Sequence, residues 1–150
     1  SGARTVPIDE FFTDFFTTAL EHGEILSEIR IPIPPALSGG CYLKVERKVG
    51  DYAAAAVAVQ LSLAADGSIE QAGIGLTNVA ALPTRAVNAE KALRGQQPSD
   101  ALFAHVGELA ADASSPADDL RGSAEYKLTL IRELTQRALR RSVERAQGRS

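Results

Sequence analysis

The chain has 150 residues, of which 45% are hydrophobic and 23% charged, so it can bury the core of one domain. Its net charge of −3 argues against a nucleic-acid partner, because phosphate backbones are bound by basic surfaces. The sequence shows neither a signal peptide nor an apolar run near the ~20 residues of a membrane span. The single cysteine, Cys41, leaves no partner for an intramolecular disulfide, and we expect a buried thiol in a cytoplasmic protein.

The first 35 residues look like the tail of a larger unit. Four of the five phenylalanines recur at helical spacing between residues 11 and 16, behind Asp9 as a candidate N-cap. This spacing predicts a short helix with an apolar face. Residues 24–31 then alternate between polar and apolar side chains, which predicts a strand that ends at Pro32.

The middle of the chain predicts an antiparallel meander. We expect a flexible joint at residues 36–40, followed by a strand at residues 41–48. Residues 53–64 carry valines and leucines at period two, and although their alanines are also compatible with a helix, the following Asp66-Gly67 turn favours a hairpin. Residues 68–78 complete that hairpin, and short turns between sequential strands are typical of antiparallel sheets.

Three helices are predicted in the second half of the chain. Thr84 is the candidate cap of a helix that stops at Gly95, while Ser99 and Ser123 are expected to cap two more, the last being the longest. Strands followed by helices indicate an α+β layer. For residues 36–150 we therefore predict a three- to four-stranded antiparallel meander with three helices packed on one face.

The sequence offers no familiar catalytic constellation, so we predict no catalytic residue and no metal site. His22 and His105 lie far apart, and neither belongs to a ligand motif. No serine lies in a nucleophile elbow, and no glycine-rich phosphate loop is present. Asp112, Asp118 and Asp119 could suggest a metal, but solvated caps or loops explain them better.

Residues 42–53 are the most informative segment, because they place two tyrosines and a Gly50-Asp51 turn between apolar strands. One interpretation is an ordinary hairpin with a solvent-exposed edge. The other is a turn that contacts a flavin or nucleotide, with Tyr52 lying on a planar ring and Asp51 accepting from a hydroxyl. Lys44 or Arg47 could then meet a pyrophosphate. The residues alone leave both interpretations open.

Short motifs spread from end to end of the chain carry a family resemblance. They are Arg4 with residues 8–12, residues 23–26 and 29–32, Tyr42 and Lys44 with residues 47–53, residues 78–79, 83–86, Glu90, residues 93–95 and 119–127. In order and spacing they resemble the C-terminal half of the FAD-binding medium subunit of molybdenum hydroxylases. The similarity is greatest to medium subunits of the carbon monoxide dehydrogenase type.

The resemblance implies a fold like that of the carbon monoxide dehydrogenase flavoprotein C-terminal domain, next to a bound FAD. In such relatives the residue matching Tyr52 lies against the isoalloxazine ring, and Gly50 and Asp51 belong to the same turn. Residues matching Leu26 and Lys44 contact the cofactor. Residues 1–35 would be the tail of the FAD-binding lobe, and residues 36–150 the C-terminal α+β domain.

The resemblance also implies partners and a place in an electron-transfer chain. A large subunit with molybdopterin oxidises the substrate, and a small iron–sulfur subunit with 2Fe-2S clusters passes electrons to the flavin, within a dimer of heterotrimers. The glycine-rich segments that grip the FAD pyrophosphate in these relatives are not in this sequence. We therefore expect a fragment that lacks FAD and is inactive by itself. The alternative is a non-catalytic assembly module without a cofactor of its own.

Overall fold

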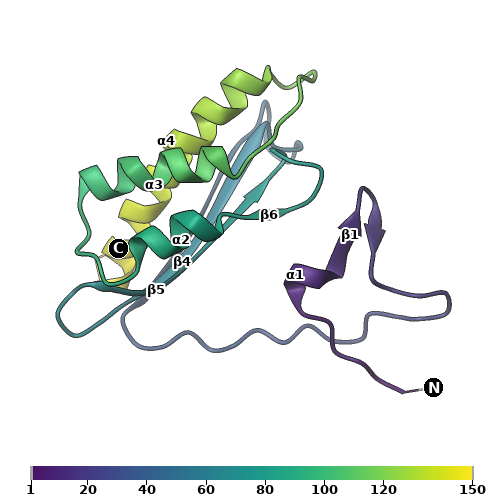
Figure 1. Ribbon diagram of the computed structural model, residues 1–150, viewed down its shortest axis with the longest axis horizontal. Helices are drawn as coiled ribbons and strands as arrows, with labels where there is room; N and C mark the ends of the chain where they lie inside the picture. Colours follow the sequence, from purple (N-terminus) through teal and green to yellow (C-terminus); the bar gives the residue numbers. More distant parts are fainter. Residues whose placement is uncertain (1, 150) are drawn as a thin grey trace. The chain divides into compact units, whose positions relative to one another are not determined.

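The computed structural model describes residues 2–149, which form two compact units divided between Ile33 and Pro34. Within the described residues of the C-terminal unit, four strands form one sheet in the order β3-β4-β5-β6, and every neighbouring pair is antiparallel (Figure 1). The strands are β3 (Ser38–Val45), β4 (Ala55–Leu63), β5 (Ile69–Thr77) and β6 (Thr84–Arg85). The predicted antiparallel meander is confirmed.

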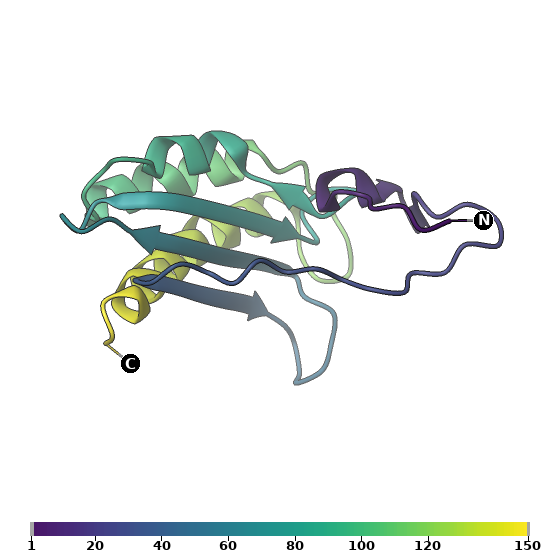
Figure 2. The same cartoon turned by 90° about the horizontal axis from the view of Figure 1, so that it is seen from below.

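Three helices cover one face of this sheet (Figure 2). They are α2 (Val87–Leu93), α3 (Asp100–Asp112) and α4 (Ala124–Ala146). The predicted caps of the last two are confirmed, because Ser99 accepts from the amide of Leu102 and Ser123 from the amide of Tyr126, each at 3.2 Å. The α+β class is therefore also confirmed. No helix within residues 2–149 is both long enough and apolar enough to span a membrane.

The core lies between the sheet and the helices. Alternation along β4 directs Val57, Val59 and Leu61 toward the helices, where they join one buried cluster with Ile131 and Leu139 of α4. Full burial of such side chains stabilises the fold by roughly 1.5–3 kcal/mol each. The core also contains Cys41, whose predicted burial is confirmed.

The joint predicted at residues 36–40 is wrong from Ser38 onward, because Ser38–Gly40 begin β3 and pair with β4. Gly39 is there for packing rather than flexibility. A Cβ at this position would overlap the carbonyl oxygen of Ser142 and stand 2.6 Å from the amide nitrogen of Ala146. Only glycine allows α4 to approach β3 this closely.

The cap predicted at Thr84 is also wrong. Thr84 lies in β6 opposite Leu76 of β5, and α2 begins only at Val87. At a helix start the first backbone N–H groups have no partner within the helix. Pairing with β5 supplies partners for the backbone here, so the chain continues as a strand. The predicted stop is confirmed, since Gly95 has a φ of +73° and donates to the carbonyl of Ile69 at 2.7 Å.

The N-terminal unit departs most from prediction. Its helix α1 spans only Ile8–Phe11, and β1 (Phe12–Asp14) then pairs with β2 (Thr17–Thr18), so the predicted phenylalanine helix is wrong. Side chains in the turn explain the difference. The Asp14 carboxylate accepts from the amide of Phe15 at 2.7 Å, and the Thr17 hydroxyl donates to the Phe15 carbonyl at 3.1 Å. Such local bonds compete with helical ones.

The strand predicted at residues 24–31 is absent from the described structure, where this segment has no regular form. Alternation predicts a strand only where a neighbour supplies hydrogen bonds. Glu24 instead binds the guanidinium of Arg4. Its two carboxylate oxygens accept from Nε at 2.8 Å and from a terminal nitrogen at 2.7 Å. These bonds lower the pKa of Glu24 to about 2.

Candidate functional site

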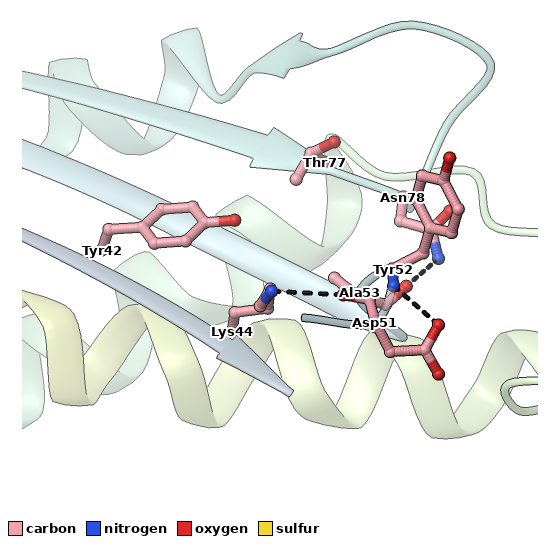
Figure 3. Close-up of a pocket in the computed structure, with 7 residues that line it drawn as sticks. All are labelled: Tyr42, Lys44, Asp51, Tyr52, Ala53, Thr77 and Asn78. Carbon is pink, nitrogen blue, oxygen red and sulfur yellow. Dashed lines mark hydrogen bonds between the residues drawn. The ribbon is translucent and has the colours of Figure 1, made fainter. Parts of the chain in front are cut away.

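A pocket of about 270 Å³ lies where β3 ends, β4 begins and β5 ends (Figure 3). It is lined by Tyr42, Lys44, Asp51, Tyr52, Ala53, Thr77 and Asn78. In Figure 3 the two tyrosines stand at opposite ends of this group, with Lys44 between them. The pocket therefore combines two aromatic rings with a cation, a carboxylate and an amide.

Strand register places small residues next to Tyr42 on one face of the sheet. Tyr42 is paired with Ala58, which is paired in turn with Gly75, so small residues continue the row beside the ring. Lys44 and Thr77 are at the two ends of the next row on the same face. This face is opposite the one covered by helices, because alternating residues point to alternate faces. The small side chains of Ala58 and Gly75 leave room beside the Tyr42 ring on this face.

The turn that carries Tyr52 is fixed by its own hydrogen bonds. Gly50 takes a φ of +85°, and the next amide, that of Asp51, donates to the Lys48 carbonyl at 3.1 Å. The Asp51 carboxylate accepts from the Tyr52 amide at 2.8 Å, and Lys44 donates to the Asp51 carbonyl at 3.2 Å. Tyr52 nevertheless keeps 81% of its surface exposed. The backbone is held in place while the ring is left free of the core.

Asn78 fixes the segment that enters β4. Its side-chain amide donates to the carbonyls of Ala53 at 2.5 Å and Ala54 at 3.1 Å. The residue has a φ of +62°, in the left-handed region that asparagine tolerates better than most residues. The turn is thereby tied to the end of β5.

Arg121 reaches the turn from the loop before α4. The centre of its guanidinium lies 5.3 Å from the centroid of the Tyr52 ring, within cation–π range. Its Nε donates to the Tyr52 carbonyl at 3.4 Å, and its second terminal nitrogen lies 3.5 Å from the Asp51 carboxylate. Both polar contacts are long and therefore weak individually. Arg121 holds the turn through these two contacts and the ring contact together.

The pKa shifts of Asp51 and Lys44 both favour their charged forms. The pKa of Asp51 is lowered, chiefly by the hydrogen bond from the Tyr52 amide and further by Arg121 and Arg47. The pKa of Lys44 is raised by its ion pair with a neighbouring glutamate. Each of the two carboxylates here is paired, Glu46 with Lys44 and Asp51 with Arg47 and Arg121.

Of the five residues predicted for a cofactor site, Lys44, Asp51 and Tyr52 line this pocket, and Gly50 shapes the turn beside it. Leu26 belongs to the N-terminal unit, where it is exposed. Sequence reasoning missed the contributions of other elements. The missed side chains are Tyr42, Thr77, Asn78 and Arg121. Three of them belong to motifs that carried the family resemblance, but only strand register and the loop before α4 show that they meet.

Comparison with known proteins places this fold in a family. The family model for the CO dehydrogenase flavoprotein C-terminal domain matches residues 40–142. The carbon monoxide dehydrogenase medium chain of Afipia carboxidovorans is 42% identical over 99% of this chain and 50% of its own length. The nicotine 6-hydroxylase medium subunit of Paenarthrobacter nicotinovorans is 34% identical over 92% of this chain and 48% of its own.

Solved structures agree with the sequence comparison. The crystal structure of a Cu,Mo-CO dehydrogenase in its cyanide-inactivated form matches 96% of this chain and 50% of its own chain, with a TM-score of 0.91 and 41% identity. The chain thus spans about half the length of the curated relatives it matches. It belongs to the family of CO dehydrogenase flavoprotein C-terminal domains.

Proposed function

We propose that this chain is the C-terminal region of the FAD-carrying, electron-transferring subunit of a molybdenum-dependent hydroxylase of the carbon monoxide dehydrogenase type. Its pocket would close over the flavin. The observation that carries this proposal is the exposed Tyr52 ring on a hydrogen-bonded turn, at the edge of a pocket that Tyr42 also lines. Membership of a flavoprotein domain family supports the same reading.

The residues of the pocket fit part of an FAD molecule. A planar ring could lie on the small side chains beside Tyr42 and against Tyr52, and stacking of this kind is worth ~0.5–1.5 kcal/mol beyond area burial. Lys44 supplies an N–H donor near the same place, while Asn78 holds the backbone of Ala53 and Ala54 beside it. A volume of about 270 Å³ is below the size of most complete ligand sites. This supports a site that holds only one end of the dinucleotide, and an isolated chain that is inactive.

When bound, FAD supplies the redox chemistry. The residues of this chain would bind, orient and shield it. Tyr52 would cover one ring face and exclude water there, while Lys44 would offer a donor to an acceptor on the ring or its side chain. Asp51 would act on the turn rather than on the ligand, since its carboxylate already accepts from the Tyr52 amide. Gly50 would shape the turn beside the flavin, and Leu26 is proposed as a separate contact to the cofactor.

We also propose the partners of the complete subunit: a small iron–sulfur subunit that delivers electrons and a large molybdopterin subunit where substrate is oxidised. These would assemble as a dimer of heterotrimers. The relatives are described as medium chains or medium subunits, which supports a place among several different chains. The substrate would then never touch this chain.

The test is Tyr52→Ala in the complete enzyme complex, with Val49→Ala as the matched control. Val49 is 98% exposed in the same turn and lies outside the pocket. Tyr52→Ala is expected to shift the flavin reduction potential, to weaken FAD binding by up to about tenfold, and to slow electron delivery to the acceptor. Reduction of the molybdenum centre by substrate should be unchanged.

Equal loss of both activities in an assembled complex would contradict the proposal. A complete subunit that assembles normally without any bound flavin would instead favour the non-catalytic assembly module. The flavin absorption of the purified subunit, measured together with its assembly state, separates these outcomes.

A further inference from the structure

The loop that precedes α4 is held by hydrogen bonds of its own. Asp119 and Gly122 exchange backbone hydrogen bonds at 3.1 and 3.2 Å, which forms a tight reversal with Arg121 near its tip. The carboxylate of Asp118 accepts from the amide of Ala124 at 2.7 Å and joins the loop to the first turn of the helix. The position of Arg121 is therefore set by the loop.

A buried lysine of α4 binds two groups of this loop. Lys127 of α4 is only 2% exposed, and its ammonium lies 2.8 Å from the Asp119 carboxylate and 2.9 Å from the Ala117 carbonyl. A buried charge is tolerated only when it is paired and hydrogen-bonded, and both partners here come from the loop. The other carboxylate oxygen of Asp119 accepts from the amide of Arg121 at 2.7 Å. A continuous series of contacts thus runs from α4 to Arg121.

The guanidinium of Arg121 continues that series to the pocket. It contacts the Tyr52 ring, the Tyr52 carbonyl and the Asp51 carboxylate, although nearly seventy residues of chain separate it from them. The planar guanidinium, with its N–H donors spread over a fork, suits these three contacts better than the compact ammonium of a lysine. The chain separation means that local sequence does not impose the contact.

We propose that Arg121 is a positioning residue for Tyr52: it holds the Asp51–Tyr52 turn and lies over one face of the phenol ring, which leaves the opposite face for a planar ligand. Lys127 and Asp119 hold Arg121 in place for this purpose. The inference rests on the proposed flavin function for its value to the enzyme, but the positioning itself is a property of the chain without ligand.

The positioning is tested by NMR on the 150-residue chain, with ¹³C label in the tyrosine rings. The chain has three tyrosines, so the Tyr52 signal can be assigned with Tyr52→Phe. In Arg121→Gln the Tyr52 ring signals should move toward those of an unstructured peptide, and the Tyr52 amide should exchange faster with solvent. Arg121→Lys should recover the signals only in part, because the charge returns without the fork of donors.

The series of contacts is tested with Asp119→Asn and Lys127→Met, which keep approximate side-chain size. Each should shift the Tyr52 signals in the same direction as Arg121→Gln although Arg121 is intact. The control is Leu120→Ala, because Leu120 is the exposed neighbour of Arg121 and should be silent. If Lys127→Met fails to fold, Asp119→Asn carries this part of the test.

Tyr52 signals that stay in place in Arg121→Gln would overturn the proposal. A shift in Arg121→Gln that neither Asp119→Asn nor a folded Lys127→Met reproduces would overturn the role given to Lys127 and Asp119. A flavin readout in the complete subunit then tests the function separately. If Tyr52→Ala leaves the flavin potential unchanged while Arg121→Gln still moves the Tyr52 ring, the flavin function fails and the positioning role stands.

Discussion

On the face of the sheet that the helices cover, β4 contributes Val57 and Leu61, and both are almost completely buried. On the other face β4 contributes Ala58 and β5 contributes Gly75, and Tyr42 of β3 is exposed. The covered face accounts for how the unit folds. The open face gives no comparable folding reason for its exposed Tyr42 ring, so we assign stability to the covered face and binding to the open face.

The largest effect is expected on the covered face. Leu139→Ala should lower the free energy of unfolding by about 2–5 kcal/mol, because Leu139 is fully buried in the core and truncation leaves a cavity. Denaturant unfolding followed by circular dichroism measures the change. Val49→Ala, at a solvent-exposed site, should stay within about 0.5 kcal/mol of the original chain. Comparable losses in both variants would mean that the covered face is not the main source of stability.

A pair of glycines compares the two faces directly. Gly39→Ala should destabilise the chain by about 1–3 kcal/mol, because its Cβ would enter the backbone of α4 at Ser142. Gly75→Ala on the open face should be tolerated, because its Cβ would lie 4.0 Å from that of Ala58, an ordinary contact. Thermal unfolding of the two variants in parallel decides the matter. An unaffected Gly39→Ala would contradict the close approach of α4 to β3.

A smaller effect is expected where the pocket turn joins the sheet. Asn78→Ala should cost about 1–2 kcal/mol of stability, since it removes the bonds to the Ala53 and Ala54 carbonyls and places alanine at a positive φ. Asn78→Gly keeps the backbone preference and should recover part of the loss. Denaturant unfolding compares the three chains. Equal losses for alanine and glycine would assign the whole effect to the amide.

The smallest effect is a local response to acid at Asp51. Its folded-state pKa lies below the ordinary value, so the carboxylate helps to hold the turn at pH values above the unfolded pKa, and this help is lost as the pH falls through the folded pKa. A ¹³C NMR titration should give a midpoint below the usual ~3.9 of aspartate. The Tyr52 amide should exchange more freely below that midpoint. A midpoint at or above the usual value would contradict the hydrogen bond from Tyr52.

The parts of the fold that sequence predicted well are those with a regular apolar period or a local cap. Alternation in β4 and the serine caps Ser99 and Ser123 depend on neighbours in the chain, and the structure confirms them. The phenylalanine helix failed because of local bonds from Asp14 and Thr17, whereas two other failures depend on distant groups. The strand at residues 24–31 lacks a partner, and Thr84 pairs with β5 instead of starting a helix.

The candidate site shows the same division. Asp51 and Tyr52 stand out in sequence because a glycine turn and an aromatic ring are adjacent there. Thr77 and Asn78 join them only through the pairing of β4 with β5, and Arg121 only through the loop that Lys127 holds. Local sequence does not determine strand register or the position of a loop, so these contacts are visible only in the structure.

The flavin fluorescence of the complete FAD-loaded subunit tests the central claim most directly. A tyrosine stacked on the isoalloxazine ring quenches its emission, so Tyr52→Leu should raise the fluorescence at equal FAD occupancy, while Val49→Ala should leave it unchanged. Unchanged emission in Tyr52→Leu, with FAD still bound, would show that the exposed ring beside this pocket does not face the flavin.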